Sequence, residues 1–159
     1  MELVVVVVLI GMMTALAVPR FRQLIFENSL KSSSRKLIGL LDRVSGKAAG
    51  DQEGLWLRFD LSADRIWLAD RETGDFSLSL PPEVDLVEVT SDDPDDPERE
   101  KRVTEGETAI WFSARGYVTR TLIRLQNDEG DALTIYLSPF LGVTRVFDGA
   151  VDFRDEQLL

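Results

Sequence analysis

The sequence contains no cysteine and no histidine among its 159 residues. It therefore cannot form disulfides, thiolate nucleophiles, zinc sites built from cysteine and histidine, or a serine–histidine–aspartate triad. Much of enzyme chemistry is excluded by these two absences. The lack of cysteine does not identify a redox compartment, since reducing cytosol and many bacterial exported proteins share it.

Basic residues are also scarce relative to acidic ones: 18 lysines and arginines face 28 aspartates and glutamates, for a net charge of -10. Glu2 and Arg20 cancel within the first 20 residues, so the whole excess lies on the remaining 139. A surface of this sign repels the phosphates of nucleic acids. We expect no nucleic-acid partner.

Charge is absent altogether from residues 3–18, which are 16 consecutive uncharged and mostly apolar positions. As a helix they would span about 24 Å of a hydrocarbon core that is about 30 Å thick. We predict that residues 1–19 form a single-pass transmembrane segment. A cleaved signal peptide is a second interpretation, but no basic region precedes the run and no small-x-small site ends it. A buried core helix is a third, although five consecutive valines leave no polar face for solvent.

One acid stands at the head of this segment. A carboxylate in hydrocarbon costs about 2.5 to 3.5 kcal/mol on insertion scales, so we expect Glu2 to have a partner in a neighbouring subunit rather than to lie unpaired at the lipid interface. Pro19 removes a backbone donor and predicts a kink near residues 15–19. Beyond it, apolar residues recur at helical spacing among basic ones, which predicts that residues 20–50 form the amphipathic, soluble half of the same helix.

The run over residues 2–21 resembles the amino-terminal helix of type IV pilins and type II secretion pseudopilins, in which an acid and a proline stand at this separation. In that family the mature chain begins with a methylated phenylalanine four residues before the acid. Here Met1 directly precedes Glu2. We therefore expect that the start is an internal methionine or that the chain has been trimmed. The resemblance implies that Glu2 pairs with the amino terminus of the adjacent subunit during filament assembly.

From residue 55 the apolar period changes to two. Leu55, Leu57 and Phe59 alternate with Trp56 and Arg58, as in a half-buried strand. We expect a first group of strands at residues 55–61, 65–69, 76–80 and 84–89, and a second group at residues 108–112, 117–125, 133–137 and 143–147. The predicted fold is α+β and pilin-like, with one long helix packed against two small antiparallel sheets, and residues 51–159 form the β-rich domain.

A second, looser pattern lies in the later strands: Ile110-x-Phe112-x-x-x-Gly116, Ile123-x-Leu125, Leu133-Thr-Ile135 and Pro139-x-x-Gly142. It is similar to the carboxy-terminal half of the H-type minor pseudopilin of type II secretion systems. The resemblance implies a location in the bacterial inner membrane with the β-rich domain in the periplasm. It also implies three kinds of partner: other pseudopilins (the major G-type and the minor I-, J- and K-types), the inner-membrane assembly platform, and the prepilin peptidase.

The three tryptophans are candidates for an aromatic ligand pocket, but core packing is the commoner fate of such residues in a small domain. We expect core packing for Trp67 and Trp111. Trp56 differs, because it falls on the polar side of its strand. Since exposed aromatic residues are enriched at interface hot spots, we expect Trp56 to contact another subunit.

An acidic loop is predicted at residues 91–107. Its first ten residues hold four aspartates, two glutamates and one arginine, and two prolines oppose a continuous helix or central strand. We expect a solvated loop between the two sheets. A calcium site at Asp92, Asp93, Asp95 and Asp96 is the alternative, although the spacing is not that of an EF-hand. We expect neither a resident metal nor a cofactor.

The function that follows is structural and not enzymatic: a minor pseudopilin near the tip of a periplasmic pseudopilus, which supports the export of folded proteins across the outer membrane. A minor pilin of a type IV pilus, involved in pilus assembly, adhesion or DNA uptake, is the alternative. An anchored hydrolase with paired acids is a third possibility, but no motif places two acids in a cleft.

Overall fold

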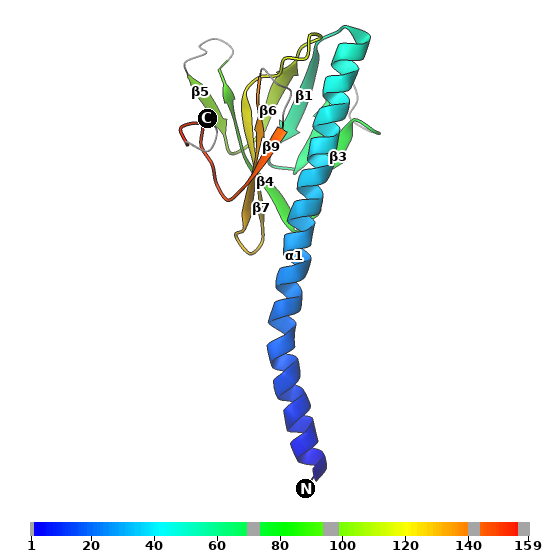
Figure 1. Cartoon of the computed structure of the whole chain (residues 1–159), viewed down its shortest axis with the longest axis vertical. Helices are drawn as coiled ribbons and strands as arrows, with labels where there is room; N and C mark the ends of the chain where they lie inside the picture. The colour runs from blue at the N-terminus through cyan, green and yellow to red at the C-terminus, as the bar shows by residue number, and fades with distance from the viewer. Residues whose placement is uncertain (1, 70–73, 94–98, 140–143, 156–159) are drawn as a thin grey trace.

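The computed structural model describes residues 2–69, 74–93, 99–139 and 144–155, and it describes the side chains of these residues except residues 2 and 14–28. Within these described residues, one helix, α1 (Glu2–Asp51), precedes nine strands. Its first half projects far beyond the strands, so the amino terminus lies at the opposite end of the molecule from the β-rich domain (Figure 1). The predicted α+β, pilin-like architecture is confirmed.

Helix α1 continues through Pro19 without interruption. The large apolar side chains between Leu3 and Met13 are 52% to 77% exposed. Among the residues that the structure describes, no helix reaches the length and hydropathy that crossing a membrane requires.

The second half of α1 buries one face. Its buried side chains follow one another at helical spacing and belong to the main hydrophobic core: Leu30, Leu37, Leu40, Leu41, Val44 and Ala48. Spacings of three and four residues bring such side chains to the same side of a helix. Ser33 and Ser34 are buried on the same side, and the Ser34 hydroxyl donates to the Lys31 carbonyl at 2.9 Å.

The first sheet has four antiparallel strands in the order β3-β2-β1-β6. Their bounds are Leu55–Asp60 for β1, Arg65–Leu68 for β2, Ser77–Ser79 for β3 and Glu107–Phe112 for β6. In β1 the expected alternation is observed, because Leu55, Leu57 and Phe59 are buried while Trp56 and Arg58 are exposed.

The second sheet has five antiparallel strands in the order β5-β4-β7-β8-β9. Their bounds are Val84–Asp92 for β4, Glu100–Val103 for β5, Thr121–Asn127 for β7, Ala132–Leu137 for β8 and Thr144–Asp148 for β9. A register shift between Leu86 and Glu88 bends β4. Helix α1 packs against β1, β3, β4, β6, β7 and β8, so the core lies between the helix and both sheets.

The division of strands between the sheets differs from the expected grouping by chain order. Strand β4, expected with β1 to β3, pairs with β7 in the second sheet, and β6 pairs with β1 in the first. Both pairings join segments that are distant in the chain. Local sequence patterns carry no information on such partners.

The segment at residues 91–107, expected as a loop between the sheets, is partly strand. Ser91 and Asp92 complete β4, and Glu100–Val103 form the edge strand β5, which pairs back onto β4. An edge strand needs only one hydrogen-bonded neighbour and tolerates charged side chains, which explains how so polar a sequence joins a sheet. Residues 94–98, including both prolines, lie outside the described residues.

Candidate assembly surfaces

The residues predicted to act in assembly lie in two separate parts of the molecule. Glu2 and Pro19 belong to the projecting half of α1, whereas Trp56 lies on β1 in the β-rich domain (Figure 1). The side chains of Glu2 and Pro19 are outside the described residues, so their pairing and kink remain predictions. The structure gives the surroundings of Trp56 directly.

All three tryptophans lie on one face of the first sheet. Trp56 pairs across β1 and β6 with Trp111, while Arg58, two residues along β1, pairs across β1 and β2 with Trp67. Paired residues and residues two apart in a strand point to the same side of a sheet. The opposite side carries Leu57 and Phe59 and faces the core.

Core packing was expected for both Trp67 and Trp111. Trp67 is buried, as expected, although it lies on the outer face of its sheet, with the Arg65 guanidinium 5.3 Å from its ring centre. Trp111 is only half-buried, so the expectation does not hold for it. Trp56 is 45% exposed, as its polar-side position predicted. The indoles of Trp56 and Trp111 lie 4.9 Å apart at a tilt of 54°.

Gly54 makes the position of Trp111 feasible. A Cβ atom at residue 54 would stand 1.8 Å from Trp111 Cζ2, so any larger residue would displace the indole. Tyr117, in the loop between β6 and β7, is also 53% exposed. We call Trp56 and Trp111 the aromatic face.

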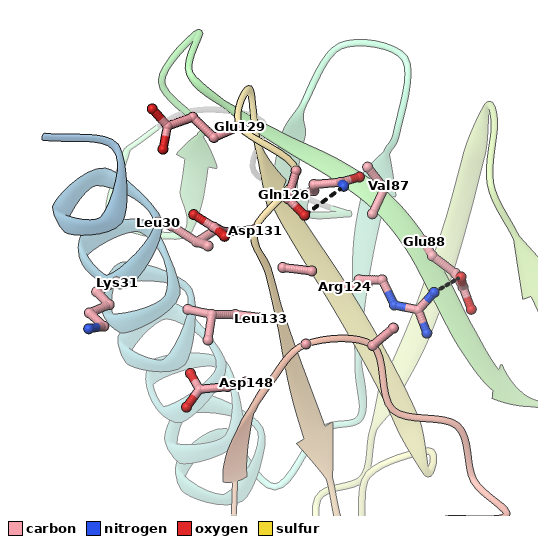
Figure 2. A pocket seen from close by; sticks show the side chains of 14 residues that line it. Leu30, Lys31, Val87, Glu88, Arg124, Gln126, Glu129, Asp131, Leu133 and Asp148 are labelled. Carbon is pink, nitrogen blue, oxygen red and sulfur yellow. Dashed lines mark hydrogen bonds and ion pairs between the residues drawn. The ribbon is translucent and has the colours of Figure 1, made fainter. Parts of the chain in front are cut away.

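A second surface, missed by the sequence reasoning, is a groove of about 1120 Å³ beside α1. Leu30 and Lys31 of the helix line one side, and the β7–β8 turn together with the end of β9 lines the other. Figure 2 shows Asp131, Leu133 and Asp148 directed toward the helix from that second side. Glu129 stands above them at the turn (Figure 2). The groove thus carries acidic side chains at the turn and at β9, and the basic side chains of Lys31 and Arg124 line it as well.

Further acids meet close to the β7–β8 turn. Burial, and then the charges of Asp64 and Asp128, raise the pKa of the Asp85 carboxyl above its ordinary value. Asp64 is held in place by accepting a hydrogen bond from the Leu86 backbone at 2.8 Å. Negative charge is thereby concentrated at this end of the β-rich domain.

Glu88, which also lines the groove, forms an ion cluster there with Arg124 (Figure 2). Its carboxylate lies 2.6 Å from Arg102 and 2.8 Å from Arg124, and the Thr90 hydroxyl donates to it at 2.8 Å. Arg124 also donates to the Val151 carbonyl at 3.4 Å, which ties the segment after β9 to the sheet. With both oxygens engaged, Glu88 has a structural role.

The residues of the calcium alternative are only partly described. Asp92 accepts two hydrogen bonds from the Arg120 guanidinium, at 2.7 and 2.9 Å, and so already has a cationic partner. Asp95 and Asp96 lie outside the described residues. Within the part of the chain that the structure describes, no group of three or more acidic side chains is arranged to hold a metal ion.

Comparison with known proteins shows the fold. Two solved structures match, and both are of the minor pseudopilin EpsH from the type II secretion system of Vibrio cholerae. One is 13% identical over 76% of this chain and 97% of that chain, with a TM-score of 0.55. The other is 14% identical over 79% of this chain and 98% of that chain, also with a TM-score of 0.55. No known sequence family and no curated protein matches the chain.

Proposed function

We propose that the chain is a minor pseudopilin of a type II secretion system, a non-enzymatic subunit near the tip of a periplasmic pseudopilus that supports the export of folded proteins. The observation that carries the proposal is a pilin-like β-rich domain on a helix whose apolar side chains from Leu3 to Met13 are exposed. Exposed apolar surface of this extent needs a lipid or protein environment to cover it. A bundle of such helices in a filament provides one.

In this proposal residues 1–19 anchor the chain in the bacterial inner membrane before assembly, and the β-rich domain occupies the periplasm. Other pseudopilins are the partners, while the assembly platform and the prepilin peptidase act on the chain during its maturation and insertion. The fold likeness to EpsH supports a secretion system over a type IV pilus, whose minor pilins share the same amino-terminal pattern.

The proposal is tested at Glu2, whose carboxylate is proposed to pair with the amino terminus of the neighbouring subunit. Glu2→Ala and Glu2→Leu should leave membrane insertion intact and lower crosslinking to the major subunit about tenfold, which corresponds to about 1.4 kcal/mol. The readout is crosslinking in intact cells, with insertion measured by membrane fractionation.

Glu53→Ala removes an exposed acid just beyond the helix and serves as the matched control. It should crosslink to the major subunit as the unmodified chain does. Crosslinking of Glu2→Ala at the unmodified level would refute the assembly role.

A further inference from the structure

Strand β9 is an edge of the second sheet that lacks the usual protection against pairing with another chain. Natural edge strands are kept apart by shortness, charge or proline. Strand β3 has only three residues, and three of the four residues of β5 are charged. Strand β9 has five residues and no proline, and Val146 at its centre is 43% exposed. Within the described residues, no strand pairs with its second edge.

The register of β9 shows which of its backbone groups point away from β8. The Gly149 amide donates to the Ala132 carbonyl at 2.8 Å, so these two residues form a hydrogen-bonded pair. Hydrogen-bonded pairs alternate with non-bonded pairs along antiparallel strands, so Phe147 and Arg145 are the next residues of β9 that bond to β8. The N–H and C=O groups of the remaining residues point away from β8: Thr144, Val146 and Asp148.

The opposite edge of the same sheet, β5, is described by the same rule. The Asp93 amide donates to the Arg99 carbonyl at 2.8 Å, which makes this a hydrogen-bonded pair between the ends of β4 and β5. By the alternation along antiparallel strands, the residues whose N–H and C=O groups point away from β4 are Glu100 and Arg102. Both edges of the sheet thus present backbone donors and acceptors at known positions.

The two edge strands also run in the same direction, because four successive antiparallel pairings separate β5 from β9. A second copy placed beside the first without inversion therefore brings its β5 parallel to β9. Both copies then carry α1 on the same face of the joined sheet and in the same direction, as helices anchored in one membrane require. Pairing of two β9 edges needs a two-fold axis, which would oppose the helices or place them on opposite faces.

We propose that β9 pairs in parallel with β5 of a second copy of this chain, with Val146 beside Lys101. In a parallel ladder a residue bonds to the two neighbours of the residue beside it. The Val146 N–H then donates to the Glu100 carbonyl, and the Val146 carbonyl accepts from the Arg102 N–H. This register also agrees with the faces of the strands, since Val146 lies on the core side with Ile135 and Lys101 lies on the core side with Val103.

The side chains on the outer face complement one another in this register. Exposed Arg145 stands beside exposed Glu100, and Phe147 stands beside the exposed Arg102, which brings together an opposite-charge pair and a cation–π pair. The contact joins different edges, so it is head-to-tail and can repeat along a filament. It rests on the proposed function, because it assigns a subunit contact within the same assembly.

The absence of native cysteine makes the test direct. Full-length chains carrying Arg145→Cys and Glu100→Cys, with distinguishable tags, are produced together in one cell and treated with a mild oxidant. Neighbouring strands lie about 4.8 Å apart, which is within the Cα separation that a disulfide bridges. We expect a disulfide-linked dimer. Arg145→Cys with Arg102→Cys is the matched control: Arg102 lies two residues further along β5, about 6.6 Å away, and this pair should give at least fivefold less dimer.

A proline substitution tests the backbone pairing itself. Val146→Pro removes the N–H that points away from β8 and should lower the yield of the disulfide about tenfold. Proline is tolerated in an edge strand where the N–H faces away from the sheet, so thermal unfolding should be nearly unchanged. Val146→Thr keeps the N–H and is the matched control, which should retain most of the dimer. Equal yields from the two variants would overturn the assigned hydrogen bonds.

Two other results would overturn the inference: no dimer above the Arg102 control, or as much dimer from Arg145→Cys alone, which would indicate pairing of two β9 edges. Both are distinguishable from failure of the proposed function. If Glu2→Ala impairs crosslinking to the major subunit while the Arg145 and Glu100 pair gives no disulfide, the filament role stands and the edge pairing falls. If the disulfide forms and Glu2→Ala crosslinks normally, the edge pairing stands and the assembly role of Glu2 falls.

Discussion

At the scale of single residues, the outward tryptophans show how far alternation along a strand determines environment. Trp56 and Trp67 both occupy outward positions of the first sheet, but their exposed fractions are 45% and 8%. Alternation predicts the face on which a side chain lies. It does not predict what covers that face, and near Trp67 the Arg65 guanidinium provides part of the cover.

The exposure of Trp56 leads to a prediction for assembly. Trp56→Ala should lower crosslinking of the chain to its filament neighbours about 30-fold, the loss expected for a hot spot of about 2 kcal/mol. The free energy of unfolding should fall by only about 1 kcal/mol, because the substitution removes one aromatic pair outside the main core.

Trp56→Phe is the matched control, since it retains a ring beside Trp111, and it should keep most of the crosslinking. Chemical denaturation of the purified chains gives the stability comparison. If Trp56→Ala crosslinks to its neighbours as the unmodified chain does, the aromatic face is not a subunit contact.

At the scale of elements, the strands themselves were largely predictable, whereas their partners were not. The alternation of Leu55, Leu57 and Phe59 located β1, and the apolar residues around Ile123 and Ile135 located β7 and β8. The pairing of β1 with β6 joins segments distant in the chain, both of which contact the helix, and no local pattern indicates it. Strand β5 escaped prediction for a related reason, because Glu100–Val103 is stabilised as a strand only by its pairing with β4.

Of the candidate surfaces, one could likewise be predicted from the sequence and the other could not. The exposure of Trp56 followed from one strand considered alone. The groove beside α1 required three elements to meet, namely α1, the β7–β8 turn and β9, and no spacing in the sequence places Asp148 near Leu30. Sequence reasoning identified single side chains but not surfaces formed by several elements.

The ion cluster that joins β4, β5 and β7 gives a prediction about the second sheet. Glu88→Ala should lower the free energy of unfolding by about 3 kcal/mol, because it leaves the largely buried Arg124 without its carboxylate. Arg124 Nε already has no hydrogen-bond partner within the described residues, and the exposed Asp152 carboxylate, 3.4 Å from Arg124, offsets only part of the loss.

Arg102→Ala is the matched control, since that side chain is 57% exposed and also pairs with Glu88. Arg102→Ala should lower the free energy of unfolding by less than about 1 kcal/mol, because exposed ion pairs usually contribute no more than that. Urea denaturation followed by circular dichroism measures both variants. Equal losses for the two would show that burial does not determine the strength of this cluster.

At the scale of the whole molecule, one part of helix α1 is exposed and another part is buried in the core. The exposed apolar residues from Leu3 to Met13 contribute nothing to the core, and Leu30 is the first residue of α1 that the core includes among those with described side chains. Among the residues with described side chains, the core therefore uses only the later part of one continuous helix. The projecting half requires an environment that the β-rich domain does not supply.

Truncation of the helix tests which part of α1 the fold requires. A chain that begins at Ser29 keeps every described core residue, and Ser29 then stands where it can cap the new helix terminus. This chain should therefore remain folded and water-soluble. A chain that begins at Asp42 loses Leu30, Leu37, Leu40 and Leu41, each worth about 2 to 5 kcal/mol when deleted from a core, and should not fold. Cooperative thermal unfolding by circular dichroism distinguishes them. If the chain that begins at Ser29 showed no cooperative transition, residues before it would contribute to folding and the division of α1 would be wrong.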